Sequence, residues 1–372
     1  MLPHMRRLVC LDGLRGVLAF YVMLSHTLPF VPLPHWLHWL FLHGEAGVDV
    51  FFILSGLVIV QSLVGYGYRP APFLIARAAR IYPVFLVVFA LSVAVQPIAT
   101  AFGAMPWIPS DSPARFIWSG GWPSGWRMGI ITHLTMTHGL FPNGMLPDVW
   151  VGFLGAAWSL STEWQFYVLA LLLGARLGPV RLAWLFLAIS ATAIAWHATV
   201  PEAWQFSRAF LPNKAQYFAL GIVSASVVCG QDWRAYAGVL AAALALCLVQ
   251  GGFHKLLPPM VWTMCFLAQM EASTSGLLAP LVVIAGRALQ SRPLVWLGAV
   301  SYCIYLVNEP VQKLLGAALA VIVQGDAMMF TALWIPTAIV LPILAAWWLH
   351  KRVEIPAQRY GRGIAPGAVS DG

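Results

Sequence analysis

The chain has 372 residues, of which 60% are hydrophobic and only 9% are charged. A soluble domain carries about 25% charged residues, so this chain could not cover its surface in water. Many of its apolar runs also approach the ~20 residues that a helix needs to cross a bilayer. The composition therefore excludes a water-soluble protein and predicts an all-α, polytopic bundle of transmembrane helices.

The formal net charge of +8 does not indicate a nucleic-acid-binding protein. The basic residues gather in short stretches between apolar runs, as they do in membrane proteins. The five cysteines are scattered, mostly inside apolar runs, and show no CxxC or metal-ligand spacing. We interpret them as small hydrophobic side chains and expect neither a disulfide framework nor a bound metal.

The N-terminal stretch carries Arg6 and Arg7 and continues into an apolar run, which superficially resembles a signal peptide. Asp12 and Arg15 interrupt that run, and no small-residue cleavage site follows it. We therefore expect a first span that is retained in the protein.

In chain order, the apolar runs predict about ten spans. They lie at 13–30, 46–64, 73–96, 158–174, 180–199, 213–229, 235–250, 258–273, 294–318 and 328–349. Most of the Arg and Lys residues between spans fall on the side of the N-terminus, which predicts that both termini are cytoplasmic. Residues 1–350 would form one transmembrane domain, and residues 351–372 would form a short basic cytoplasmic tail.

The stretch 128–141 is apolar but shorter than a normal span. Counting it as a crossing would invert every later loop and place the basic tail outside the cell. We therefore expect it to be a re-entrant or interfacial segment.

Two segments predicted to lie outside the cell, 31–45 and 97–127, are rich in Trp. This pattern is typical of an aromatic belt at the level of the lipid headgroups. The alternative is a platform on which sugar faces stack.

Ionisable residues inside spans are costly and therefore mark candidate functional sites. Arg15 and His26 are eleven residues apart in the first span. This spacing places them on one face of a helix, roughly 16 Å apart along its axis. Arg15 would lie near the cytoplasmic end and His26 near the outer end.

Two carboxylates are predicted to lie at the depth of His26. Asp49 falls about one turn below the outer surface in the second span, and Glu163 opens the span at 158–174. His26, Asp49 and Glu163 would then converge, as a general base and its orienting carboxylates require. The alternative is that these groups simply satisfy one another or face the outer interface.

Arg77 and Arg80 are three residues apart, on one helix face at the cytoplasmic end of the third span. They could be inner-leaflet anchors that snorkel to the interface, which is the favoured interpretation of the pair alone. They could also bind the phosphates of a nucleotide-like donor. Glu309 and Lys313, four residues apart within a span, are expected to pair with each other.

The motifs of the chain, taken in order, resemble those of the acyltransferase 3 family of integral membrane acyltransferases. LDGLRG followed by His26 resembles the Arg-x10-His signature, GVDVFFILSG the second-span motif, and ARAARIYP the Arg-x-x-Arg pattern. WSLSTEWQFY, SYCIYLVNEPV and VEIPAQRYGR resemble later motifs of the family. The ordered set spans residues 11–362, so the resemblance covers nearly the whole chain.

The resemblance implies a ten-span enzyme that moves an acyl group, usually acetyl, from cytoplasmic acetyl-CoA to a hydroxyl of an extracytoplasmic or lipid-linked glycan. It implies that His26 is catalytic and that Arg15, Arg77 and Arg80 act on the donor side. The family is widespread in bacteria, where the membrane would be the inner (plasma) membrane.

Two positions depart from the family pattern. Trp164 stands where many members have a second acidic residue, and Asn308 stands where the penultimate span often has His. The second departure bears on the acceptor and leaves His26 unaffected.

Two functions of other kinds would use the same intramembrane residues. A proton-coupled transporter or flippase is one, although the internal repeats common in transporters are not evident here. A glycan polymerase or ligase is the other, and it would need no coenzyme A. The acceptor sugar and the oligomeric state are not indicated by the sequence.

Overall fold

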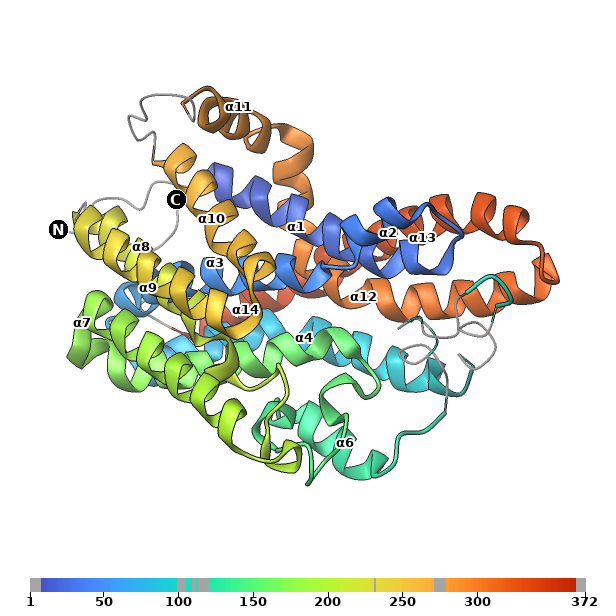
Figure 1. Cartoon of the computed structure of the whole chain (residues 1–372), viewed down its shortest axis with the longest axis horizontal. Coiled ribbons are helices and arrows are strands. Elements are labelled where there is room, and N and C mark those ends of the chain that lie inside the picture. Colours follow the sequence, from blue (N-terminus) through green and yellow to red (C-terminus); the bar gives the residue numbers. More distant parts are fainter. Residues whose placement is uncertain are drawn as a thin grey trace.

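The computed structural model describes residues 8–98, 105–108, 112, 115, 121–230, 232–270 and 279–365. Within these ranges the chain forms helices and loops and no β-sheet, which confirms the predicted all-α bundle (Figure 1). The helices are α1 Val9–Thr27, α2 His35–Phe41, α3 Gly44–Gly65, α4 Pro70–Val95, α6 Trp126–Leu134, α7 Trp158–Thr199, α8 Ala215–Gly230, α9 Trp233–Gly251, α10 Leu257–Gln269, α11 Ala279–Leu289, α12 Arg292–Val323, α13 Ala327–Leu349 and α14 Ile355–Ile364.

Seven helical segments in the described part of the chain are long and apolar enough to cross a membrane. They are Val9–Phe30, Trp39–Gly65, Pro70–Ile98, Gly155–Thr199, Trp233–Gly251, Arg292–Val323 and Ala327–Ile364. The prediction of about ten spans differs from this number for two reasons. Two predicted spans fall on the shorter helices α8 and α10, and two others fall on α7.

The segment α7 is a helical hairpin. Gly178 has a φ of 68°, in the left-handed region that favours glycine, and it separates two helical halves. The rings of Phe166 and Phe186 lie 5.5 Å apart, whereas twenty residues of straight helix would separate them by roughly 30 Å. The two halves are therefore antiparallel, and α7 accounts for both predicted spans.

The bundle has two ends, which we name the arginine end, where Arg15 and Arg77 lie, and the histidine end, where His26 lies. Arg77 Nη2 donates to Ser62 Oγ in the last turn of α3, at 2.9 Å. Gly44, the first residue of α3, packs against the last turn of α1. Helices α1 and α4 therefore run from the arginine end to the histidine end, and α3 runs back.

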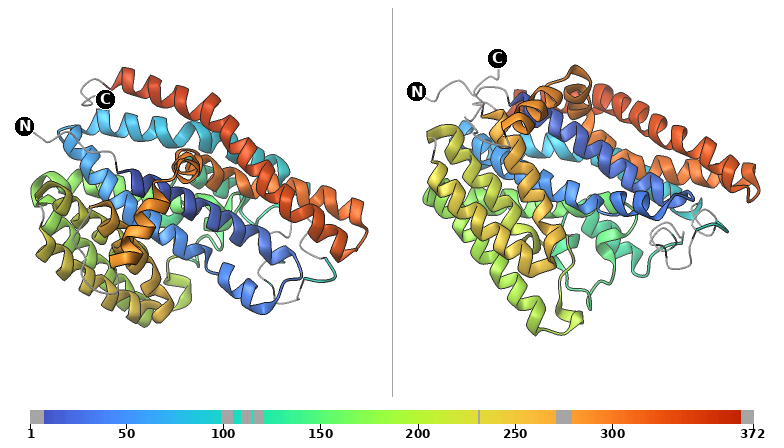
Figure 2. Two further views of the ribbon diagram at one scale, coloured as in Figure 1. Left: turned by 90° about the horizontal axis from the view of Figure 1, so that it is seen from above. Right: turned by 45° about the horizontal axis from the view of Figure 1, so that its top comes forward.

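Close backbone contacts bring α1 against α12, which lie side by side in Figures 1 and 2. A Cβ atom on Gly298 would lie 1.9 Å from the carbonyl O of Asp12, so only glycine fits there. Fifteen residues later on α1, Thr27 Oγ1 accepts from Gln312 Nε2 at 2.8 Å. The two helices are thus parallel, and small residues hold them in one register.

The stretch 128–141 contributes part of α6 and the short helix η3 (His138–Leu140). Neither is long enough to span a bilayer, as expected for a re-entrant or interfacial segment.

Residues of the predicted tail continue the fold. His350–Glu354 form one turn of π-helix, and α14 follows it. Gly361 of α14 packs on Ala79 of α4, so the described chain begins and ends at the arginine end. The division of the chain at residue 350, and the side of the membrane that this end faces, stay predictions.

Candidate functional site

His26 lies in the last turn of α1 and faces α12. Its imidazole interacts with the side chain of Asn308 and with the charges of Glu309 and Lys313. The Nδ1 atom of His26 and the Oδ1 atom of Asn308 are both buried, and apart from each other they have no hydrogen-bond partner among the described residues. An imidazole N–H and an amide oxygen are complementary, so Asn308 can select the tautomer of His26.

Glu309 is the carboxylate that interacts with His26. It forms the predicted ion pair with Lys313, at 2.9 Å, and both side chains are buried. Its Oε2 atom also accepts from the backbone N–H of Ala156, at 3.3 Å, in the short helix η5 (Gly155–Ala157). Ionic and backbone contacts therefore hold a buried carboxylate beside His26.

The predicted convergence of His26, Asp49 and Glu163 is not observed. Asp49 is fully buried, and its Oδ1 atom lies 2.7 Å from Lys214 Nζ, on the side of α3 that faces α8 and α10. Its Oδ2 atom lies 3.9 Å from Lys255 Nζ. The depth of Asp49 could be read from the sequence, but the direction in which α3 presents it could not.

Glu163 lies deeper in the bundle than predicted. Its Oε1 atom accepts from Ser55 Oγ at 2.8 Å and from Tyr167 Oη at 2.5 Å. Ser55 is six residues beyond Asp49 on α3, which is roughly 9 Å along the helix. Glu163 therefore belongs with the arginines and not with His26.

A cavity of about 110 Å³ opens between α1, α3, α4, α7 and α12. Arg15, Arg77 and Arg80 line it at the arginine end, and Glu163 also lines it. The Nε atom of Arg77 is buried and has no hydrogen-bond partner in the part of the chain that the structure describes. The structure thus brings together the three arginines that the sequence singled out, and their guanidinium groups are suited to binding an anion.

The far end of this cavity approaches the His26 group. Val48, Ser159 and Tyr305 line it there, and Tyr305 precedes Asn308 and Glu309 by about one turn of α12. The Oη atom of Tyr305 donates to the carbonyl O of Ala156 at 3.0 Å. His26 itself does not line the cavity. Tyr305 therefore stands between the arginine-lined space and His26.

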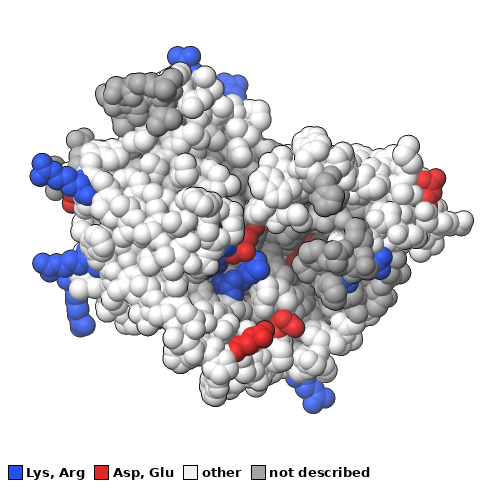
Figure 3. Space-filling model, viewed as in Figure 1, with Lys and Arg blue, Asp and Glu red and all other residues white. Residues whose placement is uncertain are grey.

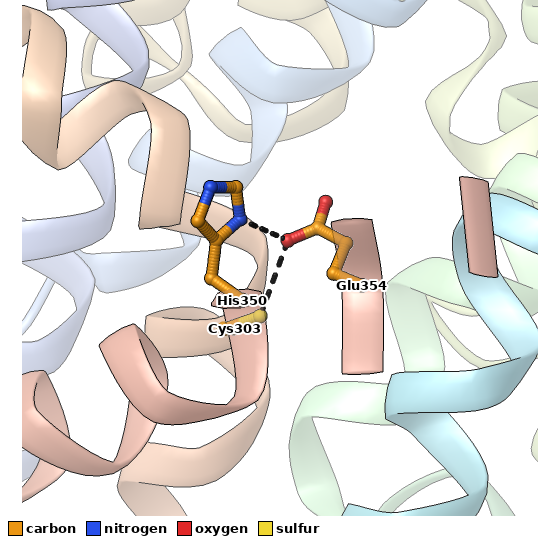
Figure 4. A group of neighbouring side chains, drawn as sticks. All are labelled: Cys303, His350 and Glu354. Carbon is orange, nitrogen blue, oxygen red and sulfur yellow. Dashed lines mark hydrogen bonds and ion pairs between the residues drawn. The ribbon is translucent and has the colours of Figure 1, made fainter. Parts of the chain in front are cut away.

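Behind the arginines lies a group that sequence reasoning missed, made of Cys303, His350 and Glu354 (Figure 4). Glu354 Oε2 accepts from His350 Nδ1 at 2.7 Å and from Cys303 Sγ at 3.3 Å. The only sequence signal was the spacing of His350 and Glu354, one turn apart.

The same three residue types can bind a metal ion, and their donor atoms lie within 4.8 Å of one another. However, Glu354 also interacts electrostatically with Arg15 and Arg80. Two guanidinium groups oppose a cation at this position. We therefore interpret the group as a hydrogen-bonded carboxylate that supports the arginines.

Two buried histidines, His133 and His138, stack at the histidine end with ring centroids 4.3 Å apart. His133 also stacks on Phe89. His133 Nδ1 donates to the carbonyl O of Gly129 at 2.8 Å, and His138 Nε2 donates to that of Ala157 at 3.1 Å. Burial lowers the pKa of His133 to about 4. Burial, and then the neighbouring His133, lower the pKa of His138 well below its usual range.

The chain matches a known protein family over most of its length. The family model described as an acyltransferase domain matches residues 8–351. The chain is 28% identical over 338 residues to Acyltransferase MdmB of Streptomyces mycarofaciens, covering 85% of this chain and 81% of the relative. It is 26% identical over 316 residues to a Komagataeibacter xylinus protein named as the membrane-bound transacylase BcsY. This match covers 81% of this chain and 72% of the relative. No solved structure matches the chain.

Stability should fall as the pH decreases from about 6.5 to 4. The unfolded chain protonates His133 near its ordinary pKa of about 6.5, whereas the folded protein does so only near pH 4, so protons favour unfolding in this window. His133 alone should lower the free energy of unfolding by about 3 kcal/mol over this pH range. Thermal unfolding of the detergent-solubilised protein measures it. His133→Phe keeps the ring stack and should flatten the pH dependence, and an unchanged slope would contradict the assignment.

Lys214→Met should destabilise the protein by about 3 kcal/mol, because it leaves the buried Asp49 without its closest partner. The double variant Asp49→Asn with Lys214→Met should recover most of the loss, since neither charge is then unpaired. Melting temperatures in one detergent compare the three proteins. A double variant no more stable than Lys214→Met would show that the pair is not the cause.

Proposed function

We propose a reaction for this chain on the premise that it belongs to the acyltransferase 3 family and is an integral membrane acyltransferase. The proposed donor is a cytoplasmic acyl-CoA, with acetyl as the acyl group. The proposed acceptor is a hydroxyl of an extracytoplasmic or lipid-linked glycan. Both named relatives come from bacteria, which supports a place in the bacterial inner membrane.

The observation that carries the proposal is the arginine-lined cavity that leads toward the His26 group. Arg15, Arg77 and Arg80 suit the phosphates of coenzyme A, because guanidinium groups bind phosphate oxygens in pairs. The Nε–H of Arg77, which no described residue accepts, is a donor that a phosphate would satisfy. The arginine end would then face the cytoplasm.

The size of the cavity limits which part of the donor enters it. At about 110 Å³ it is smaller than the ~300–1,000 Å³ of typical small-molecule sites. It suits a thin flexible chain better than a whole nucleotide. We therefore place the acyl-pantetheine arm inside the cavity, with the thioester near Tyr305, and the adenine nucleotide outside the arginines.

His26 supplies the proton transfer. As a general base it takes the proton of the acceptor hydroxyl, whose oxygen bonds to the thioester carbonyl carbon. The carbon–sulfur bond then breaks, and His26 returns the proton to the thiolate of coenzyme A. In a second route, His26 attacks the thioester carbonyl carbon, the carbon–sulfur bond breaks, and the coenzyme A thiolate leaves. The acceptor oxygen then bonds to the acyl carbon, the bond from that carbon to His26 breaks, and the hydroxyl proton passes to the thiolate. In both, Asn308 would orient the ring and Glu309 would stabilise its charged form.

The proposed roles of the two other carboxylates follow from their positions. Glu163 is placed with the donor arginines, where it balances their charge and fixes Ser55 and Tyr167. Asp49 is proposed to stabilise the bundle through its ion pair with Lys214. Tyr305 is proposed to move aside when the thioester reaches His26, because it separates the cavity from the His26 group.

His26→Gln should lower acyl transfer by about 10²–10⁴-fold, the contribution of a positioned general base, with no loss of coenzyme A binding. Transfer of radiolabelled acetyl from acetyl-CoA by the protein in nanodiscs measures it. His197→Gln is the control, since His197 lies outside the site and bonds to Gln205. Normal transfer by the folded His26→Gln variant would refute the role.

The double variant Arg77→Gln with Arg80→Gln should weaken coenzyme A binding by about 100-fold or more, because each charge-assisted hydrogen bond contributes about 1.5–3 kcal/mol. Isothermal titration of the protein in nanodiscs gives the Kd. Arg181→Gln is the matched control, an exposed arginine at the same end outside the cavity. An unchanged Kd in the double variant would return Arg77 and Arg80 to an anchoring role.

A further inference from the structure

A charged hollow lies on the surface at the histidine end of the bundle. It is formed by Glu45, Arg208, Lys214 and Lys255, with Trp150 and Trp158 beside them. Figure 3 shows charged side chains of both signs gathered in a hollow near the middle of the face, with acidic side chains just below it and other charged side chains toward the edges. Three segments far apart in the chain supply these charges, around Glu45, residues 208–214 and Lys255, so only the tertiary structure assembles the site.

Glu45 holds the basic residues of the charged hollow together. Its Oε1 atom lies 2.5 Å from Lys214 Nζ and 3.0 Å from Lys255 Nζ. Its Oε2 atom lies 3.0 Å from Arg208 Nη1. The buried Asp49 adds one more acid behind Lys214. Three bases therefore face two acids, and the group keeps a positive excess.

Arg208 presents an accessible guanidinium in the charged hollow. Its side chain is 41% exposed, and its guanidinium lies 4.9 Å from the ring centroid of Trp150 and 5.9 Å from that of Trp158. A guanidinium has five N–H donors, and the described ion pair with Glu45 uses Nη1. An arginine stacked on an indole is rigid and can still bind an anion with its remaining donors.

The charged hollow lies next to the proposed reaction site. Arg208 interacts electrostatically with Tyr305, the residue at the far end of the cavity. Glu45 follows Gly44, which packs against Ser25, the residue before His26. The cavity therefore has the donor arginines at one end and the charged hollow beside the other, where a second substrate would enter.

We propose that the charged hollow binds the acceptor through an anionic group, a carboxylate or a phosphate carried next to the hydroxyl that is acylated. This inference rests on the proposed acyl transfer. Arg208 and Lys255 supply donors that are 41% and 20% exposed, and the positive excess favours an anion over a neutral sugar. The indole of Trp150 supplies an apolar surface for the rest of the acceptor.

The test uses the full chain in nanodiscs and three probes: methyl glucuronide with a carboxylate, glucose 1-phosphate with a phosphate, and neutral methyl glucoside. Saturation-transfer NMR titrations give the Kd of each probe at low salt. At least one anionic probe should have a Kd about 10-fold or more below that of methyl glucoside. The tighter of the two anionic probes identifies carboxylate or phosphate as the natural group.

Arg208→Gln and Lys255→Gln should each raise the Kd of the preferred anionic probe about 10-fold and leave the Kd of methyl glucoside unchanged. Arg127→Gln is the matched control, since Arg127 also stacks on a tryptophan, Trp126, but lies outside the charged hollow. Equal binding of the charged and neutral probes, no binding of any probe, or no effect of both substitutions would overturn the proposal.

Acetyl-CoA binding, measured in the same preparations, separates this inference from the proposed function. The wild-type protein and its three single variants should bind acetyl-CoA equally, because Arg208 and Lys255 lie away from the donor arginines. A wild-type protein that binds anionic sugars but not acetyl-CoA would refute the proposed function and keep the anion site. One that binds and turns over acetyl-CoA but shows no anion preference would refute only the acceptor assignment.

Discussion

The packing of α1 against α12 is the constraint on which the rest of the structure depends. Gly298 admits the backbone of α1 at a distance that no side chain would allow, and the hydrogen bond between Thr27 and Gln312 holds the other end of the contact. Because the two helices are parallel and in register, His26 is placed opposite Asn308 and Glu309. The chemical group and its carboxylate partner therefore follow from a contact between small residues.

Burying a charge in this bundle is unfavourable unless an opposite charge lies beside it, and the buried charges are therefore collected into separate groups. Glu309 pairs with Lys313, and Asp49 pairs with Lys214. The third group, which contains Glu163 and the three arginines, differs in lining a cavity, with Glu354 beside it. A buried N–H donor without a partner among the described residues, such as Nε of Arg77, is unfavourable, and this is the physical reason to place a donor phosphate there.

The all-α class, the order of the helices and the three cavity arginines could be predicted from the sequence. Hydropathy reports which segments avoid water, and positions such as Arg77 and Arg80 lie on one face by helical spacing alone. The prediction of His26, Asp49 and Glu163 as one group failed because depth in the membrane does not give the rotation of a helix about its axis. A carboxylate can lie at the right level and point to another neighbour, as Asp49 does.

The sequence by itself determined that this is a membrane bundle, that an imidazole and an arginine share one span, and which family the motifs resemble. These properties are local, because they depend on apolar run lengths and on spacing within one helix. Only the tertiary structure decided which side chains lie beside His26, namely Asn308 and Glu309. It also placed Glu354 next to the arginines and brought Glu45 and Arg208 into one charged hollow. Each of these contacts joins residues distant in the chain, and the packing of whole helices alone sets their distance.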